Sequence, residues 1–158
     1  MNAPAGLHAF PVAPATQTRI GFRVHPQLPW LVLPIGMAAQ QALDHALAPL
    51  PNVEPWLRGV LNLRGNLVPV FDIGLWQGLG AQPASAQVLV LTPGPEAMAV
   101  TCCESPKLIA VQPVGAVADD DPMATWSTSQ LFFDEGNVYE FDPQVWLRRF
   151  GRLVPRRN

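Results

Sequence analysis

The fold is decided by the stretch Leu50–Asp72, which reads LPNVEPWLRGVLNLRGNLVPVFD. Within it the dipeptide Arg-Gly occurs twice, at Arg58 and at Arg64, and each copy stands at one end of a short apolar run. Apolar and polar side chains alternate between the two copies, which is typical of a half-buried β-strand with a tight turn at each end. The stretch therefore predicts one strand at Gly59–Leu63 and, after the second turn, another at Asn66–Asp72.

Both arginines stand beside apolar residues, and each has two interpretations. Arginine in such surroundings is typical of protein interfaces, where its planar set of donors holds a carboxylate or carbonyl of a partner. The alternative is an ion pair within the chain, in which Arg58 or Arg64 holds Glu54 or Asp72. The intramolecular role is favoured for Arg58, whereas the two interpretations stand equal for Arg64.

Most of the remaining chain also shows the period of two that is typical of strands. Met37–Leu47 is the exception, because it lacks Pro and Gly and is rich in Ala, Gln and Leu, so it is the best candidate for a helix. Pro69 cannot donate to a ladder and predicts an edge strand or a bulge. Further strands are predicted near residues 20–25, 30–35, 87–91, 97–102, 107–112, 131–133 and 138–141.

An internal repeat is the most informative feature outside this stretch. The repeated residues are Gly65, Asn66, Phe71, Asp72 and Trp76, and again Gly136, Asn137, Phe141, Asp142 and Trp146. Each Asp is suited to cap a short helix, and Gly78 and Gly151 stand where those two helices should end. The repeat predicts two similar strand-rich halves. Neither half could build a sufficient core alone, so the two should share one across their junction.

The chain is weakly charged, since 14% of its 158 residues are charged and the net charge is −2, against roughly 25% charged residues in a typical soluble protein. Lys107 is the sole lysine, so no broad basic face is expected for nucleic acid. Pro26–Leu43 is the longest uncharged stretch, but Pro, Gly and Gln interrupt it, so membrane insertion is not expected. Met1–Ala15 has no Lys or Arg and no continuous apolar centre, so it does not resemble a signal peptide. These features predict a cytoplasmic protein.

The chain is expected to divide into three segments. Residues 1–16 are rich in Pro and Ala and predict a disordered arm. Residues 17–153 are expected to form the folded domain, and residues 154–158 a basic tail.

Residues suited to catalysis do not form a familiar arrangement in the sequence. The three histidines are scattered, and no Ser lies in a Gly-x-Ser-x-Gly turn. Cys102 and Cys103 are adjacent, with no second pair for a metal, and are expected to be free thiols. Asp72 and Asp142 are conceivable as an acid–base pair, but a helix-capping role is favoured for both. We therefore expect no catalytic residue, metal or cofactor.

The segment Leu50–Asp72 resembles the signature of the CheW family of chemotaxis coupling proteins. The matching features are a Pro-rich start, an aromatic residue, Arg-Gly-Val, Asn-Leu-Arg-Gly, Val-Pro-Val and a final Asp. A weaker resemblance extends from Arg19 to Arg152. It implies a mainly β fold, with two small SH3-like five-stranded β-barrels around a shared hydrophobic core and short helices. This agrees with the internal repeat.

The resemblance also implies a function and a set of residues. Members of this family are non-catalytic adaptors between the cytoplasmic tips of methyl-accepting receptors and the regulatory domain of a CheA-type histidine kinase. By motif position, Asn62 and Arg64 would lie near the receptor-facing groove, with Arg64 the leading candidate. The full predicted partner-binding set is Leu50, Trp56, Arg58, Asn62 and Arg64. The residues expected to hold the turns and strand ends are Gly59, Gly65, Pro69 and Asp72.

Three segments depart from the family pattern. Met37–Leu47 offers Gln40, Gln41 and Asp44 where members usually have an acidic residue. Ile73–Trp76 replaces residues that are often basic, and Thr101–Glu104 replaces the usual Val-Asp. A pilus-linked adaptor of twitching motility, or a member with another partner, therefore stands beside flagellar chemotaxis.

A hypothesis from another class is a small barrel that binds single-stranded nucleic acid by stacking bases on exposed aromatic side chains. The tryptophans that motivate it are Trp30, Trp56, Trp76, Trp126 and Trp146. The scarcity of Lys and Arg argues against it.

Overall fold

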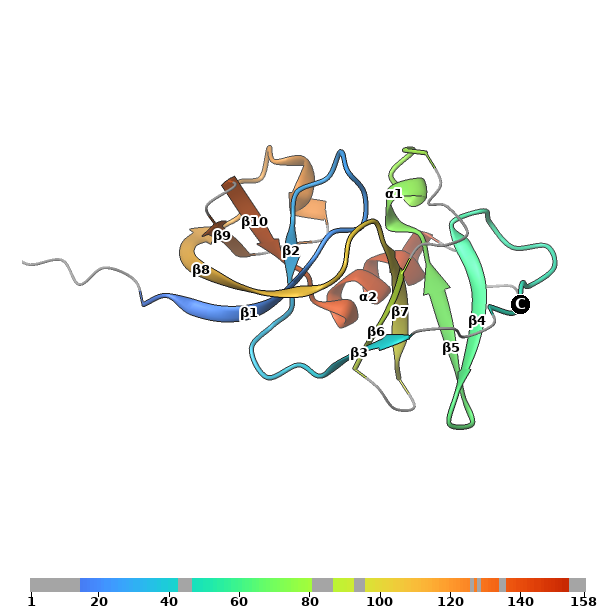
Figure 1. Cartoon of the computed structure of the whole chain (residues 1–158). Helices are drawn as coiled ribbons and strands as arrows, with labels where there is room; N and C mark the ends of the chain where they lie inside the picture. The colour runs from blue at the N-terminus through green and yellow to red at the C-terminus, as the bar shows by residue number, and fades with distance from the viewer. Residues whose placement is uncertain are drawn as a thin grey trace, which may run out of the picture.

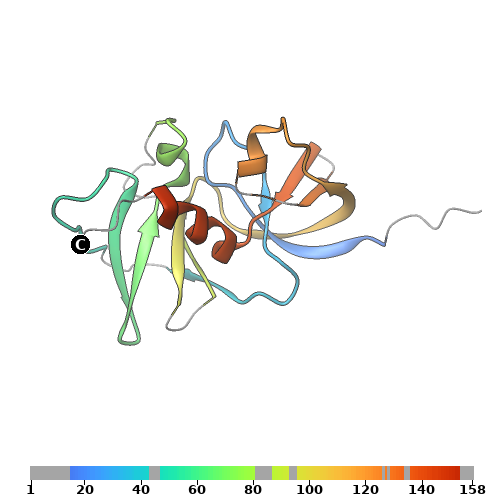
Figure 2. The same cartoon turned by 180° about the vertical axis from the view of Figure 1, so that it is seen from behind.

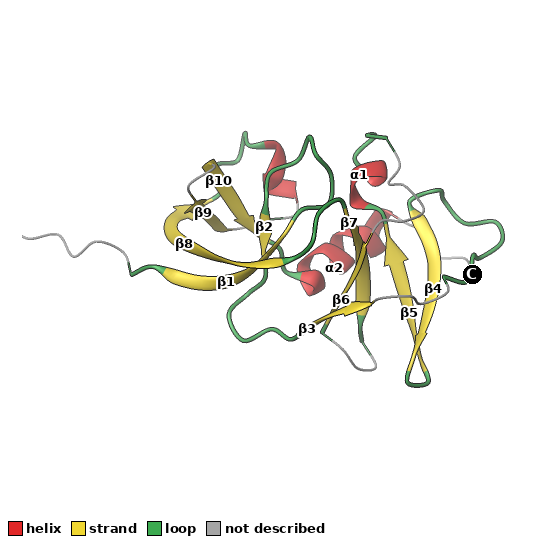
Figure 3. Ribbon diagram, in the orientation of Figure 1, coloured by secondary structure: helices red, strands yellow, loops and turns green. Residues whose placement is uncertain are grey.

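The computed structural model describes residues 15–42, 47–80, 87–92, 96–125, 127, 129–133 and 136–153. Within them the chain forms two five-stranded sheets with short helices between (Figure 1, Figure 3). The first sheet closes into a barrel in the order β1-β2-β10-β9-β8, from β1 (Gln17–Phe22), β2 (Leu31–Val32), β8 (Lys107–Ala116), β9 (Ser129–Phe133) and β10 (Gly136–Glu140). The second has the order β3-β6-β7-β5-β4, from β3 (Ala39–Ala42), β4 (Leu57–Leu63), β5 (Asn66–Phe71), β6 (Gln87–Leu91) and β7 (Met98–Cys102). The predicted mainly β fold of two five-stranded units is confirmed.

Only the first sheet is a closed ladder. The edges of the second sheet are β3 and β4, and one isolated bridge extends β4 to the chain that follows β3. In that bridge the Ala48 N–H donates to the Val60 carbonyl at 3.0 Å and the Val60 N–H donates to the Ala48 carbonyl at 2.9 Å. The second unit is therefore a curled sheet rather than a complete barrel.

The helices are short and follow the two repeated Asp residues. Helix α1 (Ile73–Trp76) follows Asp72, and α2 (Pro143–Leu153) follows Asp142, while a 3-10 turn occupies Pro122–Thr125. The Asp72 carboxylate accepts the Leu75 N–H at 3.0 Å, and that of Asp142 accepts the Gln144 N–H at 2.9 Å. Both predicted caps are thus confirmed. No helix in the described part of the chain is long and apolar enough to cross a membrane.

The internal repeat is visible in the strand pairing. Each sheet contains one parallel pair, β10 with β2 in the barrel and β5 with β7 in the second sheet, and all other pairs are antiparallel. The barrel and the second sheet have equivalent strand orders. In this equivalence β1 and β2 correspond to β6 and β7, and β8, β9 and β10 correspond to β3, β4 and β5. The repeated halves are not consecutive, however. The barrel takes strands from both ends of the chain, and the whole second sheet is inserted between β2 and β8.

The repeated aromatic residues meet at the junction of the two units. Helix α2 follows β10 of the barrel but extends over the second sheet (Figure 2). There Trp146 lies 4.9 Å from Phe71 and 5.5 Å from Trp76, measured between ring centroids. Phe141 packs against Phe22 of β1 at 5.9 Å. One buried cluster contains residues of both sheets, so the predicted shared core is confirmed.

The helix predicted at Met37–Leu47 is wrong in its described part. Ala39–Ala42 forms β3, which pairs antiparallel with β6 from Ala39 opposite Leu91 to Ala42 opposite Val88. Ala, Gln and Leu have high helix propensity, but pairing with a distant strand overrides a preference of a few tenths of a kcal/mol per residue. Residues 43–46 lie outside the described residues.

Two other predicted strand features need correction. The strand expected at residues 30–35 is reduced to Leu31–Val32. Beyond it the Leu33 N–H still donates to the Ile20 carbonyl of β1 at 3.0 Å, while the Leu33 carbonyl accepts the Arg19 Nε–H at 2.8 Å.

Pro69 does not mark an edge strand, since β5 lies between β4 and β7. The alternative, a bulge, is present close by, because the register of the β4–β5 ladder shifts between Leu57 and Gly59. The ladder between β5 and β7 begins only at Val70, and Pro69 pairs with β4 alone. The missing N–H of Pro69 therefore removes no hydrogen bond from the β5–β7 ladder.

The helix ends were predicted with mixed success. Gly78 follows α1 with a φ of +83°, as expected of a glycine after a helix. Gly151 does not end α2, which continues to Leu153. A glycine inside a helix costs about 1 kcal/mol and does not by itself stop it. The proposed arm at residues 1–16 and tail at residues 154–158 lie almost wholly outside the described residues, so these boundaries stay predictions.

Gly74 of α1 contacts the loop between β1 and β2 and so joins the two units. A Cβ atom at this position would lie 2.8 Å from His25 Cδ2 and 3.0 Å from His25 Cβ. Gly74→Ala is therefore expected to lower the free energy of unfolding by about 1 to 2 kcal/mol, because the loop must move to relieve the overlap. Urea denaturation measures the loss.

The same substitution made in a His25→Ala background serves as the control. Part of its cost should disappear there, since the His25 Cδ2 atom at 2.8 Å is removed while the Cβ atom at 3.0 Å remains. An equal loss in both backgrounds would contradict the proposed contact.

Candidate partner-binding surface

The predicted site residues gather on the hairpin formed by β4 and β5. Its two-residue turn is Arg64-Gly65, between the paired residues Leu63 and Asn66. Both turn residues have positive φ, +51° for Arg64 and +87° for Gly65. Two positive φ values are the mark of a type I′ turn, whose twist matches that of the flanking strands. The hairpin tip therefore holds an arginine in the left-handed region.

The outward side of this hairpin mixes polar and apolar side chains. Along β4, Leu61 and Leu63 are buried, whereas Asn62 between them is exposed. Opposite Asn62 on β5 stands Leu67, which is 69% exposed. We call the outward side, formed by Arg58, Val60, Asn62, Arg64, Leu67 and Pro69, the hairpin face. Val60 and Leu67 are the two residues of this face that were not among the predicted site residues, and Leu67 is the exposed one.

The two arginines of the hairpin face make no side-chain ion pair or hydrogen bond within the described residues. Arg64 is exposed at the tip, while Arg58 is half-buried on β4. Asp72 is fully buried at the other end of β5, where it caps α1. The intramolecular interpretation, with Glu54 or Asp72 as the ion-pair partner, therefore finds no support for either arginine.

The other predicted partner residues differ in their exposure and in the contacts they make within the chain. Asn62 is exposed, but its Oδ1 accepts the Gly65 N–H at 3.0 Å and so stabilises the turn. Trp56 is half-buried and stacked on Phe71, with centroids 6.4 Å apart and planes at 25°. Its carbonyl accepts the Asp72 N–H at 2.8 Å. Leu50 is 38% exposed on the segment before β4. Trp56 thus anchors the hairpin, and Leu50 and Arg64 are the freer side chains.

The residues expected to be structural occupy positions that fit this role. Gly59 has a φ of +139°, and a Cβ there would lie 2.2 Å from the Ala48 carbonyl oxygen. Gly65 holds the turn, Asp72 caps α1, and Pro69 occupies the part of β5 that β7 leaves unpaired.

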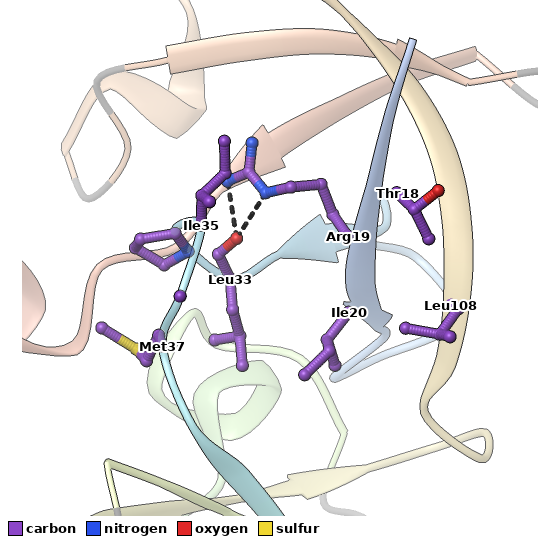
Figure 4. Close-up of a pocket in the computed structure, with 9 residues that line it drawn as sticks. Thr18, Arg19, Ile20, Leu33, Ile35, Met37 and Leu108 are labelled. Atoms are coloured by element: carbon purple, nitrogen blue, oxygen red, sulfur yellow. Dashed lines mark hydrogen bonds between the residues drawn. The ribbon is translucent and has the colours of Figure 1, made fainter.

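A pocket on the barrel was not predicted. It lies between β1 and the chain that leaves β2, and Arg19 crosses it to donate to the Leu33 carbonyl (Figure 4). Two strongly exposed apolar side chains line it, Ile35 at 72% and Leu108 at 70%. The remaining lining residues are Thr18, Ile20, Pro34, Gly36 and Met37. The alternation in β8 was an available signal, because Leu108 must point away from the buried Ile109 and Val111.

The chemistry of the described residues does not favour catalysis. Burial raises the pKa of the Cys102 thiol to about 12, and burial and the Glu104 charge also raise the pKa of Cys103. A reactive cysteine needs a lowered pKa, so neither thiol is an activated nucleophile. No group of three His, Cys, Asp or Glu side chains within the described ranges could hold a metal ion.

The tryptophans offer little surface for stacking on bases. Trp30 and Trp146 are 5% and 1% exposed. Trp56 and Trp76 are half-buried against the shared core, and Trp126 lies outside the described residues. Packing therefore accounts for the four described tryptophans among the five that motivated nucleic-acid binding.

Comparison with known proteins identifies the family. The family described as CheW-like domain matches residues 20–114. The protein PilI of Pseudomonas aeruginosa is 33% identical over 87 residues, which cover 55% of this chain and 48% of PilI. The match thus spans about half the length of this curated relative.

Among solved structures, the scaffolding protein TtCheW of Thermoanaerobacter tengcongensis has a similar fold. The TM-score is 0.61 at 15% sequence identity, over 81% of this chain and 90% of that protein. Fold and sequence signature agree, and the chain belongs to the CheW-like domain family.

Proposed function

We propose that this chain is a non-catalytic adaptor of a bacterial chemosensory system, which couples methyl-accepting receptors to the regulatory domain of a CheA-type histidine kinase in the cytoplasm. The family match supports an adaptor role, and the similarity to PilI supports a pilus-linked system. The observation on which the proposal rests most is Arg64, an exposed arginine with a φ of +51° at the tip of the hairpin face.

The conformation of Arg64 has an energetic cost that its neighbours do not explain. A non-glycine residue in the left-handed region is less stable by about 1 to 2 kcal/mol. Asn, Asp or Gly would be favoured at this position of a type I′ turn. Unfavourable backbone conformations are retained mainly at functional sites. Arg64 makes no side-chain hydrogen bond within the described residues, so its donors are available to a partner.

The surroundings of Arg64 fit a protein partner. Leu67 adds a large apolar side chain on the same face, and no lysine accompanies the arginines there. An arginine next to exposed apolar area is typical of the centre of protein interfaces. The pocket with Ile35 and Leu108 provides a second apolar surface, on the other unit. An adaptor needs two surfaces if it is to contact two partners at once.

The proposal is tested with the purified chain, the regulatory domain of the CheA-type kinase from the same genome, and the cytoplasmic tip of a receptor from that genome. We expect a complex with each partner by isothermal titration calorimetry, with dissociation constants below about 100 μM, equivalent to roughly 5.5 kcal/mol. Absence of binding to both partners at this concentration would contradict the adaptor function. The pilus and flagellar versions are distinguished by which kinase binds more tightly.

A further inference from the structure

Two exposed apolar features project from the same edge of the molecule. The tip of the β4–β5 hairpin and the connection from β2 to β3 lie along this edge (Figure 1, Figure 2). By sequence position, Leu67 belongs to the hairpin and Ile35 of the pocket to the connection. Leu67 is 69% exposed, Ile35 72% and Leu108 70%. These are the three most exposed large apolar side chains in the described part of the chain. Together they form a projecting side chain on one unit and a hollow on the other.

The pocket has the volume of a small side chain and a mixed lining, in which Thr18 and Arg19 contribute polar atoms beside the apolar walls. Its volume is about 110 Å³, and Ile20, Leu33 and Met37 contribute to its walls. An apolar cavity of about 150 Å³ accepts the six carbons of benzene. By proportion, the pocket has room for the four carbons of a leucine side chain.

Charge complements this fit. Arg64 stands at the hairpin tip near Leu67, so the projecting feature is basic. The pocket has an acidic neighbour, because Arg19 of its lining contacts Oε2 of Glu140 at 2.7 Å. The Glu140 side chain is 27% exposed, and within the described residues its other carboxylate oxygen makes no hydrogen bond. Arg19 already balances the charge of Glu140, and the other carboxylate oxygen can still accept a hydrogen bond from a guanidinium of the occupant.

We propose that the occupant of the pocket is the hairpin of a second copy of this chain. Because the hairpin and the pocket lie along one edge, a two-fold axis brings each hairpin to the pocket of the other copy and forms two equal contacts. Leu67 enters the pocket between Ile35 and Leu108, and Arg64 approaches Glu140. The dimer covers the hairpin face, so self-association and partner binding compete for the same surface.

Self-association is measured on the full chain without any partner, so this inference does not depend on the proposed function. Sedimentation equilibrium from about 5 to 200 μM should show wild-type protein passing from monomer to dimer. Leu67→Asp alone and Leu108→Lys alone should each raise the dissociation constant about 30-fold or more, because both equal contacts are lost. Circular dichroism checks that both variants are folded.

Mixing the two variants gives the decisive result. In a mixed dimer one contact is native, and the other pairs the introduced carboxylate at position 67 with the introduced ammonium at position 108. The mixture should therefore form dimers at concentrations where each variant alone is monomeric. The matched control is Val114→Asp, which places a charge at another residue of β8 that is 60% exposed but does not line the pocket.

The control should dimerise like the wild type. Three outcomes would overturn the inference: a wild-type monomer throughout the range, equal weakening by Val114→Asp, or no recovery in the mixture. The first would leave the pocket to a different partner.

Discussion

Gly59→Ala is expected to lower the free energy of unfolding by about 3 kcal/mol or more, combining steric overlap with backbone strain. The added Cβ would lie 2.2 Å from the Ala48 carbonyl oxygen and 2.9 Å from the carbon of the same group. These are backbone atoms, so no rotamer change can relieve the overlap. Ala48 must move, which breaks the bridge to Val60 that extends β4 toward the edge at β3.

Thermal unfolding measures this effect. A loss of 3 kcal/mol in a domain of this size lowers the melting temperature by roughly 6 to 12 °C. Gly65→Ala is a matched control, because Gly65 also has a positive φ, +87°, but has no atom within 4 Å of the added Cβ. It should cost only about 1 to 2 kcal/mol, the strain of a left-handed alanine.

Gly80→Ala is the second control, because its φ lies outside the positive region and the added Cβ meets no atom within 4 Å. It should be close to neutral. Equal losses for Gly59→Ala and Gly65→Ala would show that strain, and not the approach to Ala48, limits the residue at position 59.

The sequence was informative for most features that depend on neighbouring residues, with the end of α2 at Gly151 as the exception. The hairpin, the two Asp caps and the end of α1 at Gly78 were predicted, since alternation, capping and glycine turns act over a few residues. The repeat of Phe71 and Trp76 at Phe141 and Trp146 predicted two similar halves, and a shared core was expected because neither half could build a sufficient core alone. In the structure these four residues belong to one aromatic cluster.

Features that depend on pairing between distant residues were not predictable from local pattern. The segment Ala39–Ala42 becomes a strand because β6 lies beside it, although its composition favours a helix. The interleaving of the two halves likewise follows from β1 pairing with β8, some ninety positions away, at Gln17 opposite Val111. Local propensities of a few tenths of a kcal/mol per residue cannot reveal either arrangement.

The candidate surface also combines features that neighbouring residues determine with features that depend on contacts between distant residues. The resemblance pointed to the Asn62–Arg64 region, and the structure shows both residues exposed on one hairpin. It could not reveal that Asn62 already binds the Gly65 N–H, whereas Arg64 has no such contact in the described part. The pocket beside Ile35 was missed because it is formed by three segments that are separated in sequence, β1, the chain after β2, and β8.

Arg64→Asn is expected to separate function from stability. Asparagine tolerates the left-handed region better than arginine, so the variant should be as stable as the wild type or more stable by about 0.5 to 1 kcal/mol. Its affinity for the partner that binds the hairpin face should fall about 10- to 30-fold, the loss typical of an arginine at the centre of an interface. Most mutations that weaken binding do not stabilise the fold. Weaker binding together with equal or higher stability is therefore expected only of a residue whose side chain binds the partner and whose backbone conformation is unfavourable.

Titration calorimetry with receptor tip and kinase domain, at about 1 μM adaptor to limit self-association, measures the affinity, and urea denaturation measures the stability. Arg148→Ala is the matched control, because it removes the same charge from an exposed position on α2. It should leave both affinities within about twofold, since long-range electrostatics alone contribute little at physiological salt. Unchanged binding of Arg64→Asn to both partners would remove Arg64 from the interface. A loss of stability in Arg64→Asn would instead assign the arginine a structural role in the turn.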